Sequence, residues 1–258
     1  MVGPVRLETP VMPVMPVTPV IPVLPVTTLV TGAVAAPRPP IGPALVIFDC
    51  DGVLVDSERL SHRVLHAMLI ELGAAISPQQ TVDRFIGTSL AACQARNSSL
   101  LGAAPPANFA AEFARRSRAA FEAELTLVPG VAQLLAALAV PCCVASNGNR
   151  AKVDFTLGHT GLLAQFAAQL AGRIFTADDV LHPKPAPDLF LHAARQLGAD
   201  PRRTTVVEDT PTGISAAKAA GMHAIGFAAM TPAAQLHAAG ADRVVHTMAE
   251  VQALLSAL

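Results

Sequence analysis

Aromatic residues, charged residues and long uninterrupted apolar runs are all scarce in this 258-residue chain. It has ten phenylalanines and neither tryptophan nor tyrosine, so an aromatic stacking platform for single-stranded nucleic acid is not expected. Its 18 basic and 19 acidic residues give a net charge of −1 without a basic block, which argues against nucleic acid as a partner. The apolar runs are too interrupted to form a membrane-spanning helix, so a membrane partner is not expected either.

Cysteine is also rare, and its spacing excludes two kinds of stabilising site. The four cysteines are Cys50, Cys93, Cys142 and Cys143. Their positions fit neither a zinc ligand set nor an obvious disulfide framework. We therefore expect reduced thiols and a cytoplasmic protein. With 52% hydrophobic residues, the chain has enough apolar material for a sizeable core.

The first forty residues differ in composition from the rest. Residues 10–26 read PVMPVMPVTPVIPVLPV, with a proline at every third position. Proline removes a backbone donor and fixes φ, which excludes a helix or a central strand there. Three residues per turn is the period of polyproline II, so a docking arm is one interpretation. We predict that residues 1–43 form a disordered tail, because low-complexity tails rarely pack, and the prolines also argue against a signal peptide.

From Ala44 onward, short apolar runs alternate with helical patterns, which is typical of an α/β protein with a parallel sheet. The strands are predicted at 44–48, 141–146, 172–176, 204–209, 222–227 and 242–246. The clearest helices are predicted at 57–72, 129–138, 186–197, 211–220, 232–238 and 247–257. The first of these helices has Ser57 as its expected N-cap and Gly73 as its expected end.

Residues 78–125 carry helical patterns and no convincing strand. This block reads as a helical insertion between two halves of the sheet domain. The predicted organisation is a core formed by residues 44–56 and 129–258, interrupted by a helical domain at 57–128.

Polar residues of defined type follow three of the predicted strands. Because sites in open parallel sheets form at the carboxyl ends of strands, these groups are expected to converge. They are Asp49 and Asp51 after the first strand, Ser146 and Asn147 after the second, and Glu208 and Asp209 after the fourth. Lys184 lies nearby in the sequence HPKPAPD, on a loop stiffened by prolines.

Several carboxylates in one place repel one another unless a cation binds between them. Ligand sets made only of oxygen select a hard ion, and Mg²⁺ is the expected cofactor. An aspartate can attack phosphorus to form an aspartyl-phosphate, while a hydroxyl and an ammonium group neutralise the phosphoryl oxygens. A second carboxylate two residues away could protonate the leaving group and then deprotonate water.

The segments FDCDGVLVDSE, VASNG, KPAPD and VVEDTPTGI resemble, in this order, the four motifs of the haloacid dehalogenase superfamily. The resemblance covers about residues 44–250. The helical insertion resembles the cap of the subgroup that contains sugar-phosphate phosphatases and β-phosphoglucomutase. The resemblance implies a doubly wound, Rossmann-like α/β core with an inserted, mobile helical cap.

The resemblance assigns roles to four acidic residues. Asp49 matches the nucleophile, which is also a Mg²⁺ ligand. Asp51 matches the general acid and base, with its backbone carbonyl on the metal. Asp209 matches a metal ligand, and Glu208 matches a direct or water-mediated one.

It also assigns the phosphate-binding positions, which are Ser146, Lys184 and, as an extra contact, Asn147. Candidates for substrate specificity lie on the cap side, and they are His62, Gly87, Thr88 and Ser89. The alternative for these four is a packed histidine and a plain loop. His62 and His66 could in principle bind a metal together, but no third ligand is evident.

The expected function is that of a Mg²⁺-dependent phosphatase acting on a small phosphorylated metabolite, either a sugar phosphate or a sugar-acid phosphate. The alternative is a phosphomutase similar to β-phosphoglucomutase. Such mutases have a histidine after the first motif and an arginine in the cap loop, where this chain has Ser61 and Leu90. A phosphate-binding protein without turnover is a third reading, which the four chemically intact motifs disfavour. The sequence leaves the oligomeric state open, with a monomer as the simplest expectation.

Overall fold

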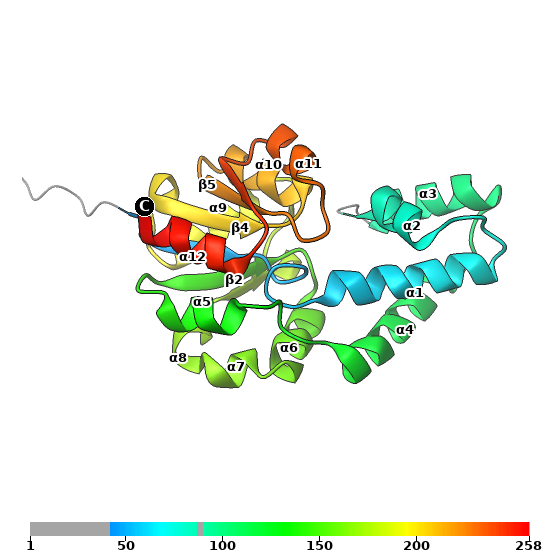
Figure 1. Ribbon diagram of the computed structural model, residues 1–258, viewed down its shortest axis with the longest axis horizontal. Helices are drawn as coiled ribbons and strands as arrows, with labels where there is room; N and C mark the ends of the chain where they lie inside the picture. The colour runs from blue at the N-terminus through cyan, green and yellow to red at the C-terminus, as the bar shows by residue number, and fades with distance from the viewer. Residues whose placement is uncertain (1–41, 87–89, 258) are drawn as a thin grey trace, which may run out of the picture. The chain divides into compact units, whose positions relative to one another are not determined.

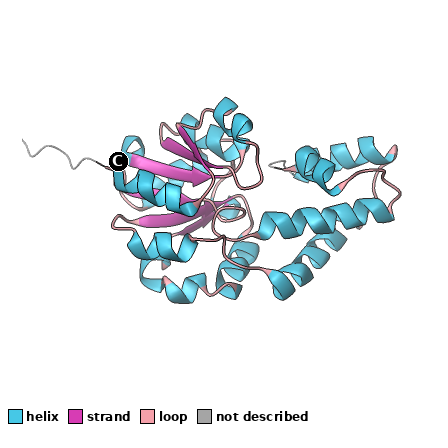
Figure 2. Ribbon diagram, viewed as in Figure 1, coloured by secondary structure: helices cyan, strands magenta, loops and turns pink. Residues whose placement is uncertain are grey.

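A computed structural model of the chain describes residues 42–86 and 90–257. Within them the strands form one six-stranded parallel sheet in the order β3-β2-β1-β4-β5-β6 (Figure 2). The strands are β1 (Leu45–Phe48), β2 (Cys142–Ser146), β3 (Ile174–Thr176), β4 (Thr204–Glu208), β5 (His223–Phe227) and β6 (Arg243–Val245). Each lies within two residues of its predicted position, and the α/β fold class is confirmed. The predicted tail lies almost wholly outside the described residues.

Twelve α-helices accompany the sheet in the described part of the chain (Figure 1). Four precede β2: α1 (Ser57–Glu71), α2 (Pro78–Phe85), α3 (Leu90–Leu101) and α4 (Phe109–Glu124). A fifth, α5 (Val131–Ala137), leads directly into β2. The others are α6 (Arg150–His159), α7 (Leu162–Gln165), α8 (Ala167–Leu170), α9 (Asp188–Gln196), α10 (Pro211–Ala219), α11 (Ala233–Ala238) and α12 (Met248–Ala257).

Helices α6, α7 and α8 were not predicted. The two shorter ones span four residues each, and α6 carries Thr156 and Gly158 in place of a continuous apolar stripe. Only three α6 residues are buried, so its apolar pattern gives a weak signal.

Both faces of the sheet are buried, which explains why its strands are apolar throughout. Leu45 and Ile47 of β1 face one cluster, which includes residues of α9, α10 and α11. Val46 and Phe48 face the other, which includes residues of α5, α6, α7, α8 and α12. Figure 1 shows α9, α10 and α11 on one side of the sheet and α5 to α8 on the other.

The register of the central strands fixes where their polar ends meet. Phe48 of β1 pairs with Val144 of β2 on one side and with Val207 of β4 on the other. The next residue of β1, Asp49, is therefore level with Ala145 and Glu208. The strand order also reverses between β1 and β4, which is where doubly wound sheets form their crevice.

Helices α1 to α4, inserted between β1 and β2, build an apolar cluster of their own. Its buried members are Leu65, Met68, Leu69, Ala74, Ile76, Phe85 and Phe109. Leu60 of α1 and Phe121 of α4 instead join the cluster under the sheet, and so connect the insertion to the core. The described part of this insertion is helical, as predicted. None of the described helices is long and apolar enough to cross a membrane.

The two ends of α1 give one correction and one confirmation. Ser57 is not the N-cap; Asp56 occupies that position, and Ser57 is the first helical residue. The Ser57 hydroxyl instead donates to Asp51 Oδ1 at 2.5 Å, a hydrogen bond strengthened by the charge of the carboxylate. Gly73 does end the helix, with φ of +86° and its N–H donated to the Ile70 carbonyl.

Candidate active site

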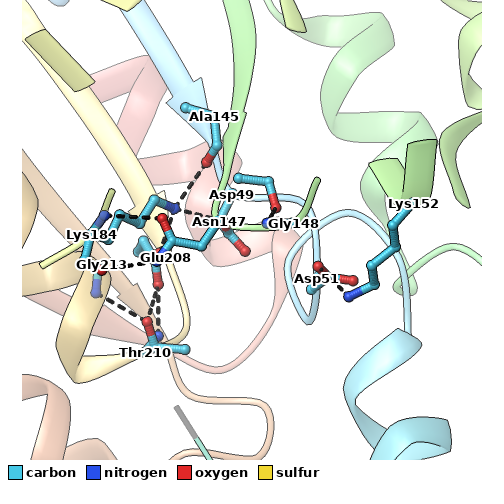
Figure 3. A network of polar contacts seen from close by, with 11 residues as sticks. Asp49, Asp51, Ala145, Asn147, Gly148, Lys152, Lys184, Glu208, Thr210 and Gly213 are labelled. Atoms are coloured by element: carbon cyan, nitrogen blue, oxygen red, sulfur yellow. Dashed lines mark hydrogen bonds and ion pairs between the residues drawn. The ribbon is translucent and has the colours of Figure 1, made fainter. Parts of the chain in front are cut away.

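The first functional side chain is Asp49, directly after β1. Its backbone N–H donates to the Val207 carbonyl at 3.0 Å and so continues the ladder toward β4. The side chain is almost fully buried, and its Oδ1 accepts from Lys184 Nζ at 2.6 Å. In Figure 3, Lys184 and Glu208 lie on one side of Asp49, while Asp51 and Lys152 lie on the other.

Lys184 connects the three central strands. Its ammonium group donates to Asp49 Oδ1, to Glu208 Oε1 at 2.8 Å and to the Ala145 carbonyl at 2.9 Å. Burial alone would lower the pKa of Lys184, but the two carboxylates raise it above its usual value. All three ammonium hydrogens therefore have acceptors, and the group stays charged inside the protein.

Asn147 holds the loop that carries Lys184. Its side-chain amide donates to the Lys184 carbonyl at 2.9 Å and accepts from the Lys184 N–H at 3.0 Å. The peptide bond from Lys184 to Pro185 is cis. A phosphate contact from the Asn147 side chain would have to replace these two bonds, so the geometry favours a positioning role.

Asp51 has different partners from Asp49. Its Oδ2 accepts from Lys152 Nζ at 2.8 Å, and its Oδ1 accepts from the Ser57 hydroxyl. Burial alone would raise the pKa of Asp51, but the charge and hydrogen bond of Lys152, together with the bond from Ser57, lower it below its usual value. Asp51 is therefore a carboxylate in this arrangement.

Glu208, at the end of β4, is anchored by protein groups at both oxygens. Oε1 accepts from Lys184, and Oε2 accepts from the N–H and the hydroxyl of Thr210, each at 2.8 Å. A side chain at Gly213 would collide with this carboxylate, so glycine is required for the close approach of α10. Direct metal ligation by Glu208 would compete with these bonds, whereas a contact through water would not.

Asp209 is buried, and its Oδ1 has no hydrogen-bond partner among the described residues. Burial raises the pKa of Asp209 well above its usual value, and the neighbouring Glu208 and Asp49 raise it further. Gly52 packs against this carboxylate at a φ of +77°, where any side chain would collide with Asp209. A buried, unsatisfied carboxylate is unfavourable unless another group binds it.

The residues present fit a hard divalent cation. Burial, reinforced by Glu208 and Asp51 and opposed by Lys184, raises the pKa of Asp49 to about 7. A cation beside Asp49 and Asp209 would relieve this repulsion and occupy the unpartnered oxygen. In the described chain no three His, Cys, Asp or Glu side chains form a ready-made metal site. Mg²⁺ is often held by only one or two carboxylates together with waters and phosphate oxygens, which matches this arrangement.

Ser146 and Gly148 form the surface that faces the two aspartates. The Gly148 N–H donates to Ser146 Oγ at 3.1 Å, which leaves the Ser146 hydroxyl hydrogen for another acceptor. A Cβ on Gly148 would lie 3.3 Å from Ser146 Oγ and 3.6 Å from Asp51 Oδ2. The missing side chain therefore keeps open a small space between Ser146 and Asp51.

These groups open into a cleft of about 750 Å³. The core contributes, among others, Asp49, Asp51, Ser146, Lys152, Lys184 and Glu208. The opposite wall comes from α1 to α4 and includes Ser61, His62, Leu65, Phe85, Arg96 and Phe113. A cleft of this size accommodates a small metabolite.

Residues 43–221 match the family of haloacid dehalogenase-like hydrolases. The chain belongs to this family. It is 33% identical over 186 residues to 6-phosphogluconate phosphatase of Escherichia coli (strain K12), with 71% of this chain and 82% of that protein covered.

Two solved structures of the family are similar throughout. A haloacid dehalogenase-like protein of unknown function from Agrobacterium tumefaciens (strain C58) has 35% identity and a TM-score of 0.77, covering 84% of this chain and 99% of its own. A family hydrolase from Deinococcus radiodurans R1, solved with bound phosphate and sodium, has 32% identity and a TM-score of 0.72, covering 84% and 96%. The family resemblance and the Rossmann-like fold predicted from the sequence are thus confirmed.

The structure brings the motif residues of this hydrolase together. Six of them line the cleft: Asp49, Asp51, Ser146, Asn147, Lys184 and Glu208. Asp209 is buried beside Gly52. Their catalytic roles remain predictions, because contacts in the resting protein do not test turnover.

The cap-side candidates have separate outcomes. His62 lines the cleft, and its Nδ1 is 2.8 Å from the Glu58 carbonyl, so Nδ1 is the donor. His66 contacts the Thr81 hydroxyl instead and does not share a site with His62. Gly87, Thr88 and Ser89 lie outside the described residues.

Sequence reasoning missed Lys152, Thr210 and Arg96. Lys152 follows Ser146 by six residues, in the first turn of α6, a helix that was not predicted. Thr210 did carry a signal, because a threonine before a proline is typical of a helix start, and it is the N-cap of α10. Arg96 carried no signal, since nothing in the sequence distinguishes it from the solvated arginines of the same region.

Proposed function

We propose that this hydrolase is a Mg²⁺-dependent phosphatase that releases phosphate from a small phosphorylated metabolite through an aspartyl-phosphate on Asp49. The observation that carries the proposal is the pairing of two carboxylates with two different lysines at one cleft. Asp49 is bound to Lys184, and Asp51 is bound to Lys152. A nucleophile and a proton carrier thus lie side by side in separate environments.

In the first step, an Asp49 carboxylate oxygen attacks phosphorus, and the bond from phosphorus to the leaving oxygen breaks. Lys184 and the Ser146 hydroxyl donate to the phosphoryl oxygens, where negative charge accumulates. Asp51 delivers a proton to the leaving oxygen, so the product leaves as an alcohol. The incoming phosphate competes for Lys152 and repels the Asp51 carboxylate, and both effects favour the protonated acid that this step needs.

In the second step, water attacks the phosphorus of the aspartyl-phosphate. Asp51, now a carboxylate, accepts a proton from this water, and Lys152 stabilises its charged form until then. The bond between phosphorus and the Asp49 oxygen breaks, which releases inorganic phosphate and regenerates the Asp49 carboxylate. Both steps therefore use the same two aspartates.

Asp49, Asp209 and the Asp51 backbone carbonyl are the groups proposed to hold Mg²⁺. When bound, the ion would neutralise charge on the phosphate and on the buried carboxylates. Glu208 supports the site mainly through Lys184 and Thr210, and a water could link it to the ion. Asn147 acts by holding the Lys184 loop.

The substrate is proposed to be a sugar phosphate or sugar-acid phosphate. One relative supports this class, because it is named for 6-phosphogluconate. The proposed organisation is a core of residues 44–56 and 129–258 with a cap of residues 57–128 above the cleft. Within the described residues none of the four cysteines forms a disulfide, in keeping with the proposed cytoplasmic location.

The test is phosphate release from a panel of sugar phosphates, phosphogluconate, phosphoglycolate and nucleotides, with Mg²⁺ and with EDTA. We expect Mg²⁺-dependent release from at least one member and none from the Asp49→Asn variant. Release that persists in Asp49→Asn would contradict the proposal. Interconversion of hexose phosphates without net release would instead indicate a mutase.

A further inference from the structure

We infer that Arg96 binds a second anionic group of the substrate, at the cap side of the cleft. The substrate class is then a phosphorylated metabolite that carries either a carboxylate or a second phosphate away from the transferred phosphate. This inference rests on the proposed phosphatase function and narrows its substrate.

Arg96 differs from most arginines of the insertion in its ion pairing. The arginines on α1 and α4 each pair with a carboxylate, and they are Arg59, Arg63, Arg115, Arg116 and Arg118. For Arg96 no such pair exists among residues 42–86 and 90–257. A partly buried guanidinium is always charged and favours an anionic partner.

The other cations of the cleft already have acidic partners. Lys184 is paired with Asp49 and Glu208, and Lys152 is paired with Asp51. Each lysine of the core side of the cleft is therefore already paired with a carboxylate, and the excess negative charge there suits the proposed ion. Arg96, on the opposite wall, is the cation of this cleft whose charge the described carboxylates leave unbalanced.

The surroundings of Arg96 strengthen an interaction with an anion. Leu65, Phe85 and Phe113 line the same wall of the cleft, so this wall is partly apolar, and the Arg96 side chain is half-buried. A charge-assisted hydrogen bond is stronger in such surroundings than at an open surface. A substrate with a neutral distal end would leave this charge without a partner.

A structural role for Arg96 is the competing explanation. Its Nη1 donates to the Arg84 carbonyl near the end of α2, which could serve only to cap that helix. This bond uses one of the five guanidinium donors. Helix capping by itself does not explain why the side chain lines the cleft.

The experiment compares sugar phosphates whose distal groups differ in charge. Glucose 6-phosphate is neutral there, 6-phosphogluconate adds a carboxylate, and a hexose bisphosphate adds a second phosphate. We would measure kcat/KM with Mg²⁺ for the wild type, Arg96→Gln, Arg96→Lys and the control Arg84→Gln. Arg84 is a suitable control, because its exposed side chain lines a different cavity of the insertion and its carbonyl is kept.

The wild type should prefer one or both charged substrates over glucose 6-phosphate. Arg96→Gln should lower kcat/KM for the preferred substrate by about 10- to 100-fold, mainly through KM, and leave glucose 6-phosphate within about twofold. Arg84→Gln should leave kcat/KM unchanged for both the preferred substrate and glucose 6-phosphate. Whether the carboxylate or the second phosphate is preferred identifies the source of the anion.

Several results would overturn the inference. One is a wild type that hydrolyses the neutral substrate as well as the charged ones, and another is an equal loss on all substrates in Arg96→Gln, which would mean helix capping alone. Should Arg96→Gln not fold, Arg96→Lys should weaken the preference at least about threefold, because an ammonium lacks the paired donors, and an unchanged preference would overturn the inference.

Calorimetric binding of the same substrates to Asp49→Asn, with Mg²⁺, separates this inference from the proposed function. If the wild type releases no phosphate at all, the proposed function fails, but binding still reports on Arg96. The charged substrate should bind at least about tenfold more tightly than the neutral one, and Arg96→Gln should remove the difference.

Discussion

The two walls of the cleft differ in how their charged side chains are paired. The core wall consists of the cleft residues of the sheet domain, and the cap wall consists of the cleft residues of α1 to α4. On the core wall, carboxylates and lysines neutralise one another through short bonds, and backbone groups hold the loops that carry them. On the cap wall, apolar side chains and the polar Ser61 and His62 line the cleft together with Arg96, a guanidinium without a described carboxylate partner. The core wall has an excess of carboxylates that suits a cation, whereas Arg96 on the cap wall suits an external anion.

This difference indicates how the work of the enzyme is divided. The core groups are fixed by a parallel sheet whose register leaves little freedom, and they suit the one reaction that every substrate undergoes. The cap groups come from helices with a separate apolar cluster, so they can vary without disturbing the chemistry. We therefore expect core substitutions to affect all substrates and cap substitutions to select among them.

Replacement of Lys184 should have the largest effect on both stability and activity. Lys184→Met would leave Asp49 and Glu208 buried without their shared cation, so stability should fall by about 3–5 kcal/mol. Activity should fall at least about 10³-fold, because a donor to the phosphoryl oxygens is lost as well. Chemical denaturation and phosphate release would measure the two effects. A stable and active variant would show that the network is dispensable.

Asp51→Asn should lower kcat by about 10²- to 10⁴-fold, because the amide cannot exchange a proton with the leaving group or with water. The fold should survive, since the amide retains an acceptor for Lys152 or Ser57. Lys152→Met is the matched comparison, because it keeps the Asp51 carboxylate, and its kcat should fall by only about tenfold. Steady-state kinetics at saturating substrate would measure kcat for both variants. A larger fall in kcat in Lys152→Met than in Asp51→Asn would contradict the assignment of Asp51 as the group that transfers the proton.

Asp209→Asn tests whether Asp209 is a ligand of the proposed Mg²⁺. Mg²⁺ at 100 times its Kd should stabilise the wild type by about 2.7 kcal/mol, and the variant should lose this response. The metal-free variant should melt about 2–4 °C higher than the wild type, because a buried and unsatisfied carboxylate has been neutralised. Thermal unfolding with Mg²⁺ and with EDTA would check both parts. An unchanged Mg²⁺ response would exclude Asp209 as a ligand.

The metal-free protein should lose stability as pH rises. Because the pKa of Asp49 is raised to about 7, above about 3.9 for an unfolded chain, the folded state binds this proton more tightly. The resulting stabilisation is fully present below about pH 4 and is lost as pH rises through about 7. Melting curves in EDTA between pH 5.5 and 8.5 should show this decline, with a smaller slope in Asp49→Asn. Equal slopes would contradict it.

Phe113→Leu, on the cap wall, should produce the smallest change in kinetic constants, and it should affect substrate binding only. Shortening an apolar side chain of the cleft should alter KM by about threefold for some substrates and leave kcat unchanged. Leu163→Met is a control, because Leu163 packs against the core cluster and does not line the cleft. A loss of kcat shared by all substrates would mean that Phe113 supports the chemistry.

The sequence predicted much more of the core wall than of the cap wall. The strands, Asp49, Asp51 and Ser146 could be located because apolar runs end in polar residues at the same sheet edge, and Lys184 from the proline-stiffened segment that resembles a family motif. The partners of Asp51 could not: Lys152 is 101 residues away and left no local pattern, and Ser57, six residues away, was predicted as a helix cap. Arg96 was equally invisible, because its distinguishing property is the absence of an ion pair, which only the fold reveals.

One measurement tests the division between the walls most directly: the rank order of kcat/KM over a panel of sugar and sugar-acid phosphates. We predict that the core variants Lys152→Met and Asn147→Ala lower every value by a common factor, within about threefold, and keep the order of the wild type. The variant Arg96→Gln should change the order, because its expected effect of about 10- to 100-fold on the preferred substrate exceeds this spread. Reordering by the core variants, or a uniform decrease by Arg96→Gln, would contradict the account.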